Sequence, residues 1–266
     1  MKANFARFWV LIAVLVIFVS CRLCSAEVTN QLPPSVSIDK TNVTESDRQT
    51  LPPPHVAPVS TKIVYKPPLR GAPAVRIDGG SRGNGISLIR LTVLAPDHTG
   101  LTVQEQPTLF WYQSEPADVP FVLTLLVDKQ AKPVLQVKLP DAKRAGIQRL
   151  NLSDYHVTLS PGVEYEWVVA LVVDPESRSK DVVASGSIQR VEPSGSLAAR
   201  LANSSKPDRP YIYAEEGIWY DALAELANLL ETQPGNASLR AERAALLEQV
   251  GITNATASAS GLVRGK

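Results

Sequence analysis

Cysteine and histidine are scarce in this sequence of 266 residues. Its two cysteines, Cys21 and Cys24, lie close to the N-terminus, so neither a disulfide framework nor a cysteine-rich metal site can form further along the chain. The three histidines, His55, His98 and His156, leave few candidates for catalysis by an imidazole. We therefore expect no metal and no cofactor.

The chain also lacks an excess of charge of either sign. Its 27 Lys and Arg residues against 26 Asp and Glu give a net charge of +1, which provides no basic field for capturing nucleic acid. Hydrophobic residues make up 44% and aromatic residues 6%, ordinary values for a globular chain. A fully disordered chain and a collagen-like chain are therefore excluded, and the length allows one or two domains.

Residues 1–26 have the pattern of a secretory signal peptide. Lys2 and Arg7 precede an apolar run over 10–19, and Cys24-Ser25-Ala26 forms a box of small residues for cleavage. The run is shorter than the ~20 residues that a membrane span needs. We therefore expect cleavage after Ala26, no membrane span in the mature chain, and an exported protein in the periplasm, the cell envelope or the medium.

Two alternatives to a cleaved signal peptide stay open. The first is lipidation at Cys21, although a lipobox prefers leucine where Phe18 stands. The second is an uncleaved anchor. Cleavage after Ala26 would leave the mature chain without cysteine, which suits an oxidising compartment without the use of disulfides.

Residues 27–70 are rich in proline and polar residues, with Pro33-Pro34, 52–54 and Pro67-Pro68. Proline fixes φ and pushes the preceding residue towards extended geometry. We expect a semi-stiff, disordered linker, which serves either as a stalk or only as a connection.

Residues 71–192 have the pattern of a β-sandwich. Short apolar runs alternate with Pro, Gly and Asp at intervals of about ten residues. The runs are 86–94, 101–104, 108–113, 121–127, 134–139, 147–152, 164–173 and 182–191. This pattern predicts a mainly β fold, an antiparallel sandwich of the immunoglobulin or fibronectin type III kind. The stretch from Leu159 to Tyr165 resembles the start of the sixth strand of fibronectin type III modules, where a tyrosine hydroxyl ties back to the preceding corner. Trp111 would be the core tryptophan.

Residues 193–252 are predicted to form a helical hairpin. A stripe of apolar residues from Trp219 to Leu230 has helical spacing, Pro234-Gly235-Asn236 interrupts it, and a second helix follows to about residue 250. Gly217 and Gly251 lie 34 residues apart, the period of tetratricopeptide repeats. The hairpin is therefore expected to be tetratricopeptide-like, and 253–266 a disordered tail.

The strand 164–173 is apolar on both faces, which indicates that something covers its outer side. A single hairpin cannot form a solenoid and must dock elsewhere. We expect the helices to pack on the face that carries 168–172, through Trp219, Leu226 and Leu230. Alternatively, the hairpin docks elsewhere and this face of the sheet awaits a partner.

Several motifs together resemble one family. They are Gly71-Ala72-Pro73, Gly79-Gly80-Ser81-Arg82-Gly83, Pro107-Thr108-Leu109-Phe110-Trp111-Tyr112, Tyr165-Glu166-Trp167, Asp174-Pro175-Glu176-Ser177-Arg178-Ser179 and Gly217-Ile218-Trp219-Tyr220-Asp221-Ala222-Leu223. Over residues 70–251 the chain resembles the cyanobacterial family catalogued as domain of unknown function 928. The resemblance implies an exported cyanobacterial protein of unassigned activity and supplies no catalytic residues.

Two groups of residues are candidates for binding. Asp174, Arg178 and Asp181 form a polar loop between two expected strands, which either binds a ligand or is held together by Arg178 and one of the carboxylates. Phe110 and Tyr112, opposite Trp111 on their strand, form either an exposed aromatic patch or a surface covered by another element.

No motif indicates catalysis. The glycine-rich stretch 76–83 lacks the Gly-Lys-Ser/Thr of a phosphate loop, and Asp97-His98 is expected to be a solvated turn. We expect a non-catalytic, exported module that binds another envelope or secreted protein. The alternative is a carbohydrate-binding module that uses the aromatic residues of the sandwich, with a glycan as partner, and an enzyme is a distant third.

Overall fold

The computed structural model of the chain describes residues 62–68, 76–80, 89–139, 143–253 and 255. The expected signal peptide, most of the expected linker and nearly all of the expected tail lie outside these residues. None of the helices in the described ranges is long and apolar enough to cross a membrane.

The first of two β-sheets has four strands in the order β1-β2-β4-β7. They are β1 (Gly79–Gly80), β2 (Arg90–Val93), β4 (Thr108–Gln113) and β7 (Gly146–Asn151), and all neighbours are antiparallel. Strand β1 lies in the glycine-rich stretch 76–83, outside the eight predicted runs. Gly79 and Gly80 form a strand because they pair with β2. Two glycines have no apolar alternation, so the sequence does not predict this strand.

The second sheet has five strands in the order β3-β9-β8-β5-β6. They are β3 (Gly100–Thr102), β5 (Phe121–Val127), β6 (Pro133–Leu139), β8 (Glu164–Leu171) and β9 (Val182–Arg190). The expectation of an antiparallel fold throughout is wrong at β3, which pairs with β9 in parallel. The mainly β architecture with helices after it is confirmed, and strands β2 to β9 overlap the eight predicted runs.

The inner faces of the two sheets share one hydrophobic core. The ring centroids of Trp111 on β4 and Phe121 on β5 lie 6.4 Å apart. On β9 a Cβ at Gly186 would lie 2.8 Å from Cβ of Ala95, so the sheets approach too closely there for any other residue. Trp111 and Tyr165 are both 4% exposed, which confirms their expected burial.

In the described part of the chain, four α-helices follow the sheets where one hairpin was expected. They are α1 (Gly195–Ala202), α2 (Arg209–Glu215), α3 (Trp219–Thr232) and α4 (Ala237–Glu248). Helices α3 and α4 form the expected hairpin. Helix α1 is too short for a clear periodic stripe; Ser194 caps its start by accepting a hydrogen bond from the Leu197 amide.

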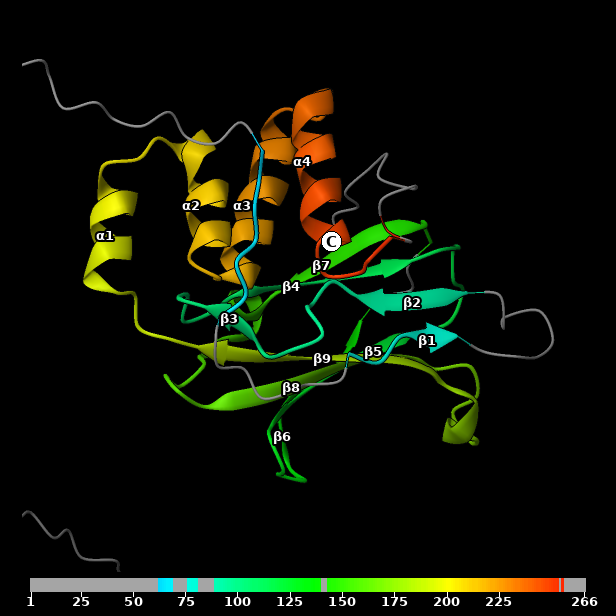
Figure 1. The fold of residues 1–266 in the computed structure, drawn as a ribbon. Helices are drawn as coiled ribbons and strands as arrows, with labels where there is room; N and C mark the ends of the chain where they lie inside the picture. The colour runs from blue at the N-terminus through cyan, green and yellow to red at the C-terminus, as the bar shows by residue number, and fades with distance from the viewer. Residues whose placement is uncertain (1–61, 69–75, 81–88, 140–142, 254, 256–266) are drawn as a thin grey trace, which may run out of the picture. The chain divides into compact units, whose positions relative to one another are not determined.

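The helices do not cover the expected face of the second sheet; they pack on β4 of the first sheet and on the edge strand β3 of the second. Helix α3 contacts β3 and β4, and Figure 1 shows the helices on the side of β2, β4 and β7. Arg149 on β7 pairs with Glu231 of α3 at 2.7 Å, and Arg149 lies across from Phe110 on β4. The expected docking of Trp219, Leu226 and Leu230 on 168–172 is therefore wrong. Phe110 and Tyr112, the candidate aromatic patch, lie on β4, the strand on which α3 packs.

Two adjacent aromatic residues anchor the start of α3 in the sheets. Trp219 is fully buried, and its indole N–H donates to the carbonyl of Leu94 at 2.9 Å. Tyr220 is 1% exposed; its hydroxyl accepts from the Trp167 indole at 2.8 Å and donates to the carbonyl of Ser187 at 2.9 Å. The hydroxyl of one helical residue thus joins β8 to β9.

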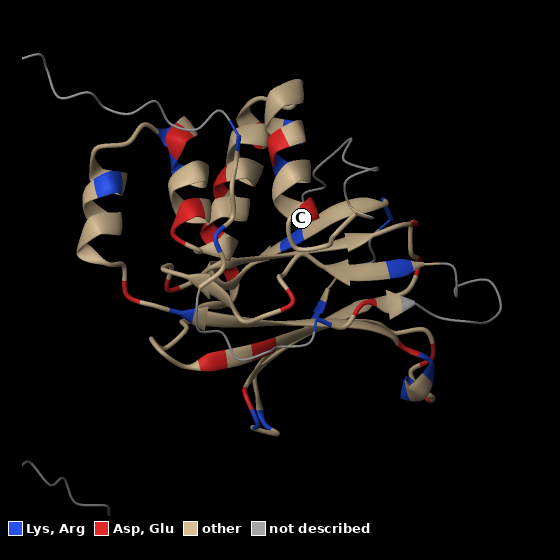
Figure 2. Ribbon diagram, viewed as in Figure 1, with Lys and Arg blue, Asp and Glu red and all other residues tan. Residues whose placement is uncertain are grey.

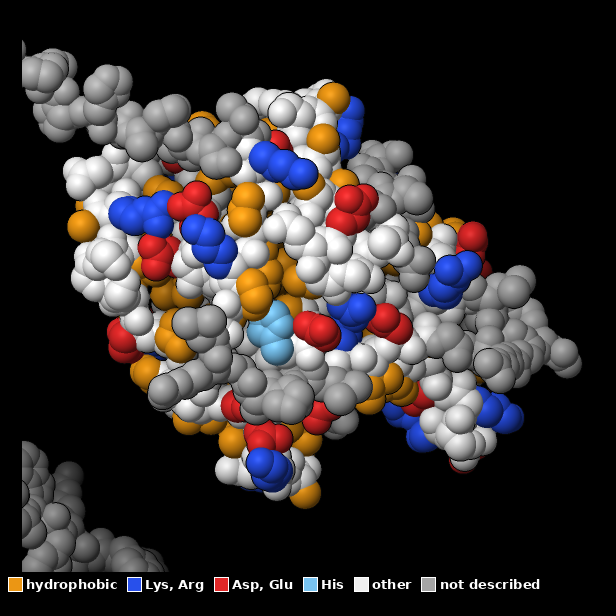
Figure 3. Space-filling view, in the orientation of Figure 1, with side chains coloured by type: hydrophobic (Ala, Val, Ile, Leu, Met, Phe, Trp, Pro, Cys, Tyr) orange, Lys and Arg blue, Asp and Glu red, His pale blue; other side chains and the backbone are white. Residues whose placement is uncertain are grey.

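Charges of both signs are spread over the described part of the molecule. Figure 2 shows basic and acidic residues interspersed on helices and at strand ends, in agreement with the net charge of +1. On the face seen in Figure 3, hydrophobic side chains form small areas among polar ones. This face therefore offers neither a field of one sign nor a broad apolar patch.

We predict that Tyr220→Phe lowers the free energy of unfolding by about 1–3 kcal/mol, because it leaves the buried Trp167 indole N–H without an acceptor. Urea unfolding followed by tryptophan fluorescence measures this change. Tyr155→Phe, at a site 36% exposed, is the matched control and should be neutral. Equal midpoints for both variants would contradict the prediction.

Candidate functional site

The predicted polar loop is held together by its own charges. The Arg178 guanidinium donates to Asp181 Oδ2 at 2.6 Å, and the Lys180 ammonium donates to Asp174 Oδ2 at 2.9 Å. The bond from Lys180, together with the Glu176 backbone N–H, lowers the pKa of Asp174. Of the two alternatives, the structure shows ion pairs that fix the loop between β8 and β9.

The predicted aromatic patch is wrong. Phe110 and Tyr112 are 2% and 4% exposed, because helix α3 packs on their strand. Neither ring can stack on a ligand from solvent. The alternative of a surface covered by another element is the correct one.

The linker prediction is wrong at residues 62–68, which we call the docked segment. It runs in extended form along the helices, as the cyan trace between the labels α2 and α4 in Figure 1 shows. Ile63 is fully buried and Tyr65 is 7% exposed, whereas Lys62, Val64 and Lys66 are exposed. In the sequence, the run of three apolar residues between Lys62 and Lys66 is a signal that could have revealed it.

Side chains of α4 hold the backbone of the docked segment. Glu242 Oε2 accepts from the Ile63 amide at 2.9 Å, and Gln249 Oε1 accepts from the Tyr65 amide at 2.8 Å. The Gln249 side-chain amide also donates to the carbonyl of Ile63 at 3.2 Å. The segment therefore runs in the same direction as α4, and these contacts recognise main-chain groups rather than a particular side chain.

On its other side the docked segment contacts α2 and the start of α3, and we call the surface that these helices and α4 present to the segment the groove. The Lys66 amide donates to the carbonyl of Ala214 at 3.0 Å, and the Tyr65 ring packs edge-on against Trp219 with centroids 5.0 Å apart. Gly217 has φ +75°, and a Cβ there would lie 2.7 Å from the carbonyl oxygen of Lys66. Only glycine permits both this turn and the close approach of the segment.

The tyrosine of the docked segment completes a row of polar groups with Asp97-His98. The Tyr65 hydroxyl lies 2.9 Å from His98 Nε2, and His98 Nδ1 lies 3.2 Å from Asp97 Oδ1. The expectation of a solvated turn holds for Asp97, whose side chain is 81% exposed, and is wrong for His98, whose side chain is 18% exposed. Burial, and secondarily the charge of Asp97, raises the pKa of Tyr65, so the phenol stays protonated. The row ties the docked segment to the turn that carries Asp97 and His98.

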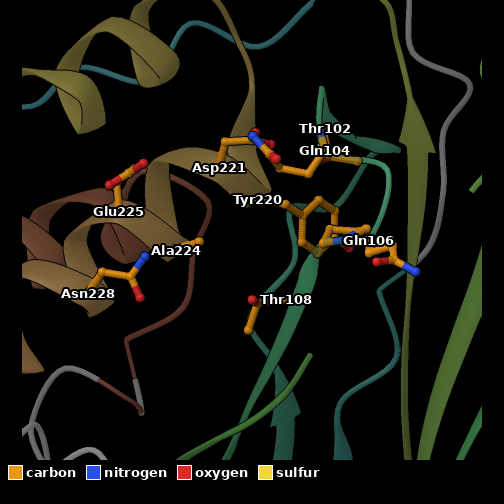
Figure 4. Close-up of a pocket in the computed structure, with 10 residues that line it drawn as sticks. Thr102, Gln104, Gln106, Thr108, Tyr220, Asp221, Ala224, Glu225 and Asn228 are labelled. Carbon is orange, nitrogen blue, oxygen red and sulfur yellow. Dashed lines mark hydrogen bonds between the residues drawn. The ribbon is translucent and has the colours of Figure 1, made fainter. Parts of the chain in front are cut away.

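A second feature is a polar cavity of ≈ 240 Å³ between α3 and the segment that joins β3 to β4 (Figure 4). Asp221, Glu225 and Asn228 lie on one face of α3, at the spacing of successive turns. Thr102 and Gln104 line the opposite side. Sequence analysis did not identify this cavity, because its two walls are more than 100 residues apart in the chain.

Asp221 is the most unusual residue of the cavity. It is 3% exposed; Oδ2 accepts from the Val103 amide at 3.3 Å, whereas Oδ1 has no hydrogen bond of good geometry. Burial raises its pKa to about 6, although hydrogen bonding from Thr102 and Gln104 opposes the rise. Burial also raises the pKa of Glu225.

We predict that Gly217→Ala loosens the docked segment, because alanine is strained at this φ and its Cβ would meet the Lys66 carbonyl. Trypsin should then cut after Lys62 roughly fivefold faster, whereas Lys66 is protected by Pro67. Mass spectrometry of timed digests measures the rate. Gly235→Ala is the control, since nothing lies within 4 Å of a Cβ there. Equal rates in both variants would argue against a held segment.

We predict that the ionisation of Asp221 weakens the fold as pH rises. A carboxyl whose pKa is raised on folding, here from 3.8 to about 6, favours the folded state below pH 4, and this contribution is lost as pH rises through 6. The loss is at most about 3 kcal/mol. Asp221→Asn should remove this part of the pH dependence in urea unfolding between pH 4 and 7, whereas Asp118→Asn, at an exposed site, should keep it. Superimposable pH profiles for Asp221→Asn and the unsubstituted protein would refute it.

Comparison with known proteins supports one assignment. A family model described as Domain of Unknown Function (DUF928) matches residues 77–260, which include both sheets and all four helices. No curated protein matches the chain. The match spans more than half of the sequence, and the chain therefore belongs to the DUF928 family.

Proposed function

We propose that the protein is an exported, non-catalytic module whose helices α2 to α4 bind an extended segment of another protein. The observation that carries this proposal is the docked segment itself. Glu242 and Gln249 hold its main chain, and Trp219 receives an aromatic side chain. A groove that recognises main-chain groups accepts other peptides with an apolar residue and an aromatic residue two positions apart.

The helical turns support the finer assignment of a tetratricopeptide-like hairpin. Gly217 and Gly251 both have φ +75°, and each is followed by isoleucine. In both turns the glycine amide bonds three residues back, and the isoleucine amide bonds five residues back. This is the Schellman arrangement at the end of a helix, repeated after 34 residues. The two turns therefore support an internal repeat, although one hairpin plus α2 is shorter than a solenoid.

The immunoglobulin or fibronectin type III relationship of the sheets is also a proposal. It is supported by Tyr165, whose hydroxyl accepts from the Ser160 amide at 3.1 Å, the tie to the preceding corner that the sequence predicts. Burial of Trp111 between the sheets agrees with it. The parallel pairing of β3 with β9 departs from a purely antiparallel sandwich.

The alternative of a carbohydrate-binding module depends on exposed aromatic residues of the sandwich, and its candidate residues Phe110 and Tyr112 are buried. Phe110, Trp111 and Tyr112 are all buried, so the described strand β4 presents no aromatic platform. The proposal of a non-catalytic role is supported by the ion pairs of the 174–181 loop and by the protonated state of Tyr65.

Binding of a peptide in trans can be measured directly. A fluorescein-labelled peptide of residues 60–68 should bind the Tyr65→Ala variant of the mature protein at least about tenfold more tightly than the unsubstituted protein, whose groove holds its own segment. Adding Gln249→Ala should abolish this gain, because it removes the contacts to the Ile63 and Tyr65 main chain. A peptide of scrambled order is the control. No binding by folded Tyr65→Ala protein would refute the peptide groove.

Export is tested separately. We expect N-terminal sequencing of the protein purified from its native cells to begin at Glu27. Unprocessed chain that begins at Met1 in the cytosolic fraction would contradict export, and an N-terminus blocked at Cys21 would indicate lipidation instead.

A further inference from the structure

The cavity beside α3 presents hydrogen-bond donors and acceptors side by side. Asp221 and Glu225 offer carboxylate oxygens, and the amides of Gln104, Gln106 and Asn228 both donate and accept. In Figure 4 these side chains come from α3 on one side and from the β3–β4 connection on the other. A ligand that carries several neighbouring groups, each able to donate and to accept, matches such a lining.

We propose that this cavity binds a small uncharged polyol of the size of one sugar ring. This site is independent of the peptide groove, because none of the residues that line it holds the docked segment. Hydroxyl groups both donate and accept, and a sugar ring presents several of them on adjacent carbons. They would donate to the carboxylates of Asp221 and Glu225 and accept from the amide of Asn228.

The size of the cavity limits the ligand. Sites for drug-sized molecules have volumes of about 300–1,000 Å³. At ≈ 240 Å³ the cavity lies below this range, so a single ring fits and an oligosaccharide would extend into solvent. Pro107 and Ala224 supply the small apolar area against which the carbon atoms of a ring can pack.

Asp221 supplies the buried acceptor. Its Oδ1 atom lacks a hydrogen bond of good geometry, and the residue is 3% exposed. The side chain of Gln104, which lies beside Asp221 in Figure 4, belongs to an exposed residue and can change rotamer at little cost. A ligand hydroxyl in the place of the Gln104 side chain would donate a hydrogen bond to Asp221 Oδ1.

The charges around the cavity favour a neutral ligand over a cation. Burial raises the pKa of Glu225, and the positive charges of Arg209 and Lys206 oppose part of this rise, so part of the negative charge is already compensated. Tyr213 and Tyr220 are further titratable groups near the acid pair, and burial raises the pKa of both. Within the described ranges no three His, Cys, Asp or Glu residues are grouped to hold a metal ion.

Ligand-observed saturation-transfer NMR on the mature protein tests the site. The probes are glucose, galactose, mannose and myo-inositol, with calcium chloride and spermidine titrated in parallel. We expect at least one polyol to bind, with an affinity at least tenfold weaker in Asn228→Ala and in Glu225→Gln. Glu248→Gln, at an exposed position on α4, is the matched control and should bind like the unsubstituted protein.

The dependence on pH provides a second readout. A hydroxyl that donates to Asp221 prefers the ionised carboxylate, so polyol binding should strengthen between pH 5 and 7, and Asp221→Asn should abolish this trend. Absence of binding by all four polyols to folded protein overturns the proposal. So does binding that survives both cavity substitutions, or binding of calcium or spermidine in place of a polyol.

Discussion

The burial of three consecutive residues at the start of α3 is the constraint on which the rest of the structure depends. Trp219 bonds to the carbonyl of Leu94 and forms the floor of the groove for the docked segment. Tyr220 enters the core and joins β8 to β9 through its hydroxyl. Asp221 accepts from the backbone after β3 and lines the cavity. The position of one helical turn therefore sets the sheets, the groove and the cavity together.

This arrangement explains why β3 is so closely fitted. A Cβ at Gly100 would lie 2.6 Å from the Tyr220 ring. The close approach of β3 to α3 therefore requires glycine at position 100. The next residues of the same strand then bring Thr102 and the Val103 amide to Asp221. Strand β3 lies between α3 on one side and β9, with which it pairs in parallel, on the other.

Most of the secondary structure could be predicted, since apolar alternation and breakers recur regularly from residue 89 to 190. The contact between helices and sheets could not. Phe110 and Tyr112 lie on one face of a strand that is apolar on both faces, just as 168–172 do, so alternation alone cannot identify the covered sheet. In the structure, the ion pair between Arg149 on β7 and Glu231 on α3 lies on the covered sheet. No spacing in the sequence reveals this pair. Docking of residues 62–68 was not predicted either, because proline and lysine make up most of this segment and are typical of a linker.

The docked segment and the helix α4 that holds it are in contact but lie far apart in the sequence. The hydrogen bonds from Ile63 and Tyr65 to α4 span 179 to 186 residues. In a chain that is made from its N-terminus, residues 62–68 emerge before the strands, and α4 emerges after them. Contacts of such long range form late, because they close the largest loop. The segment can therefore take its place only after α4 has been made.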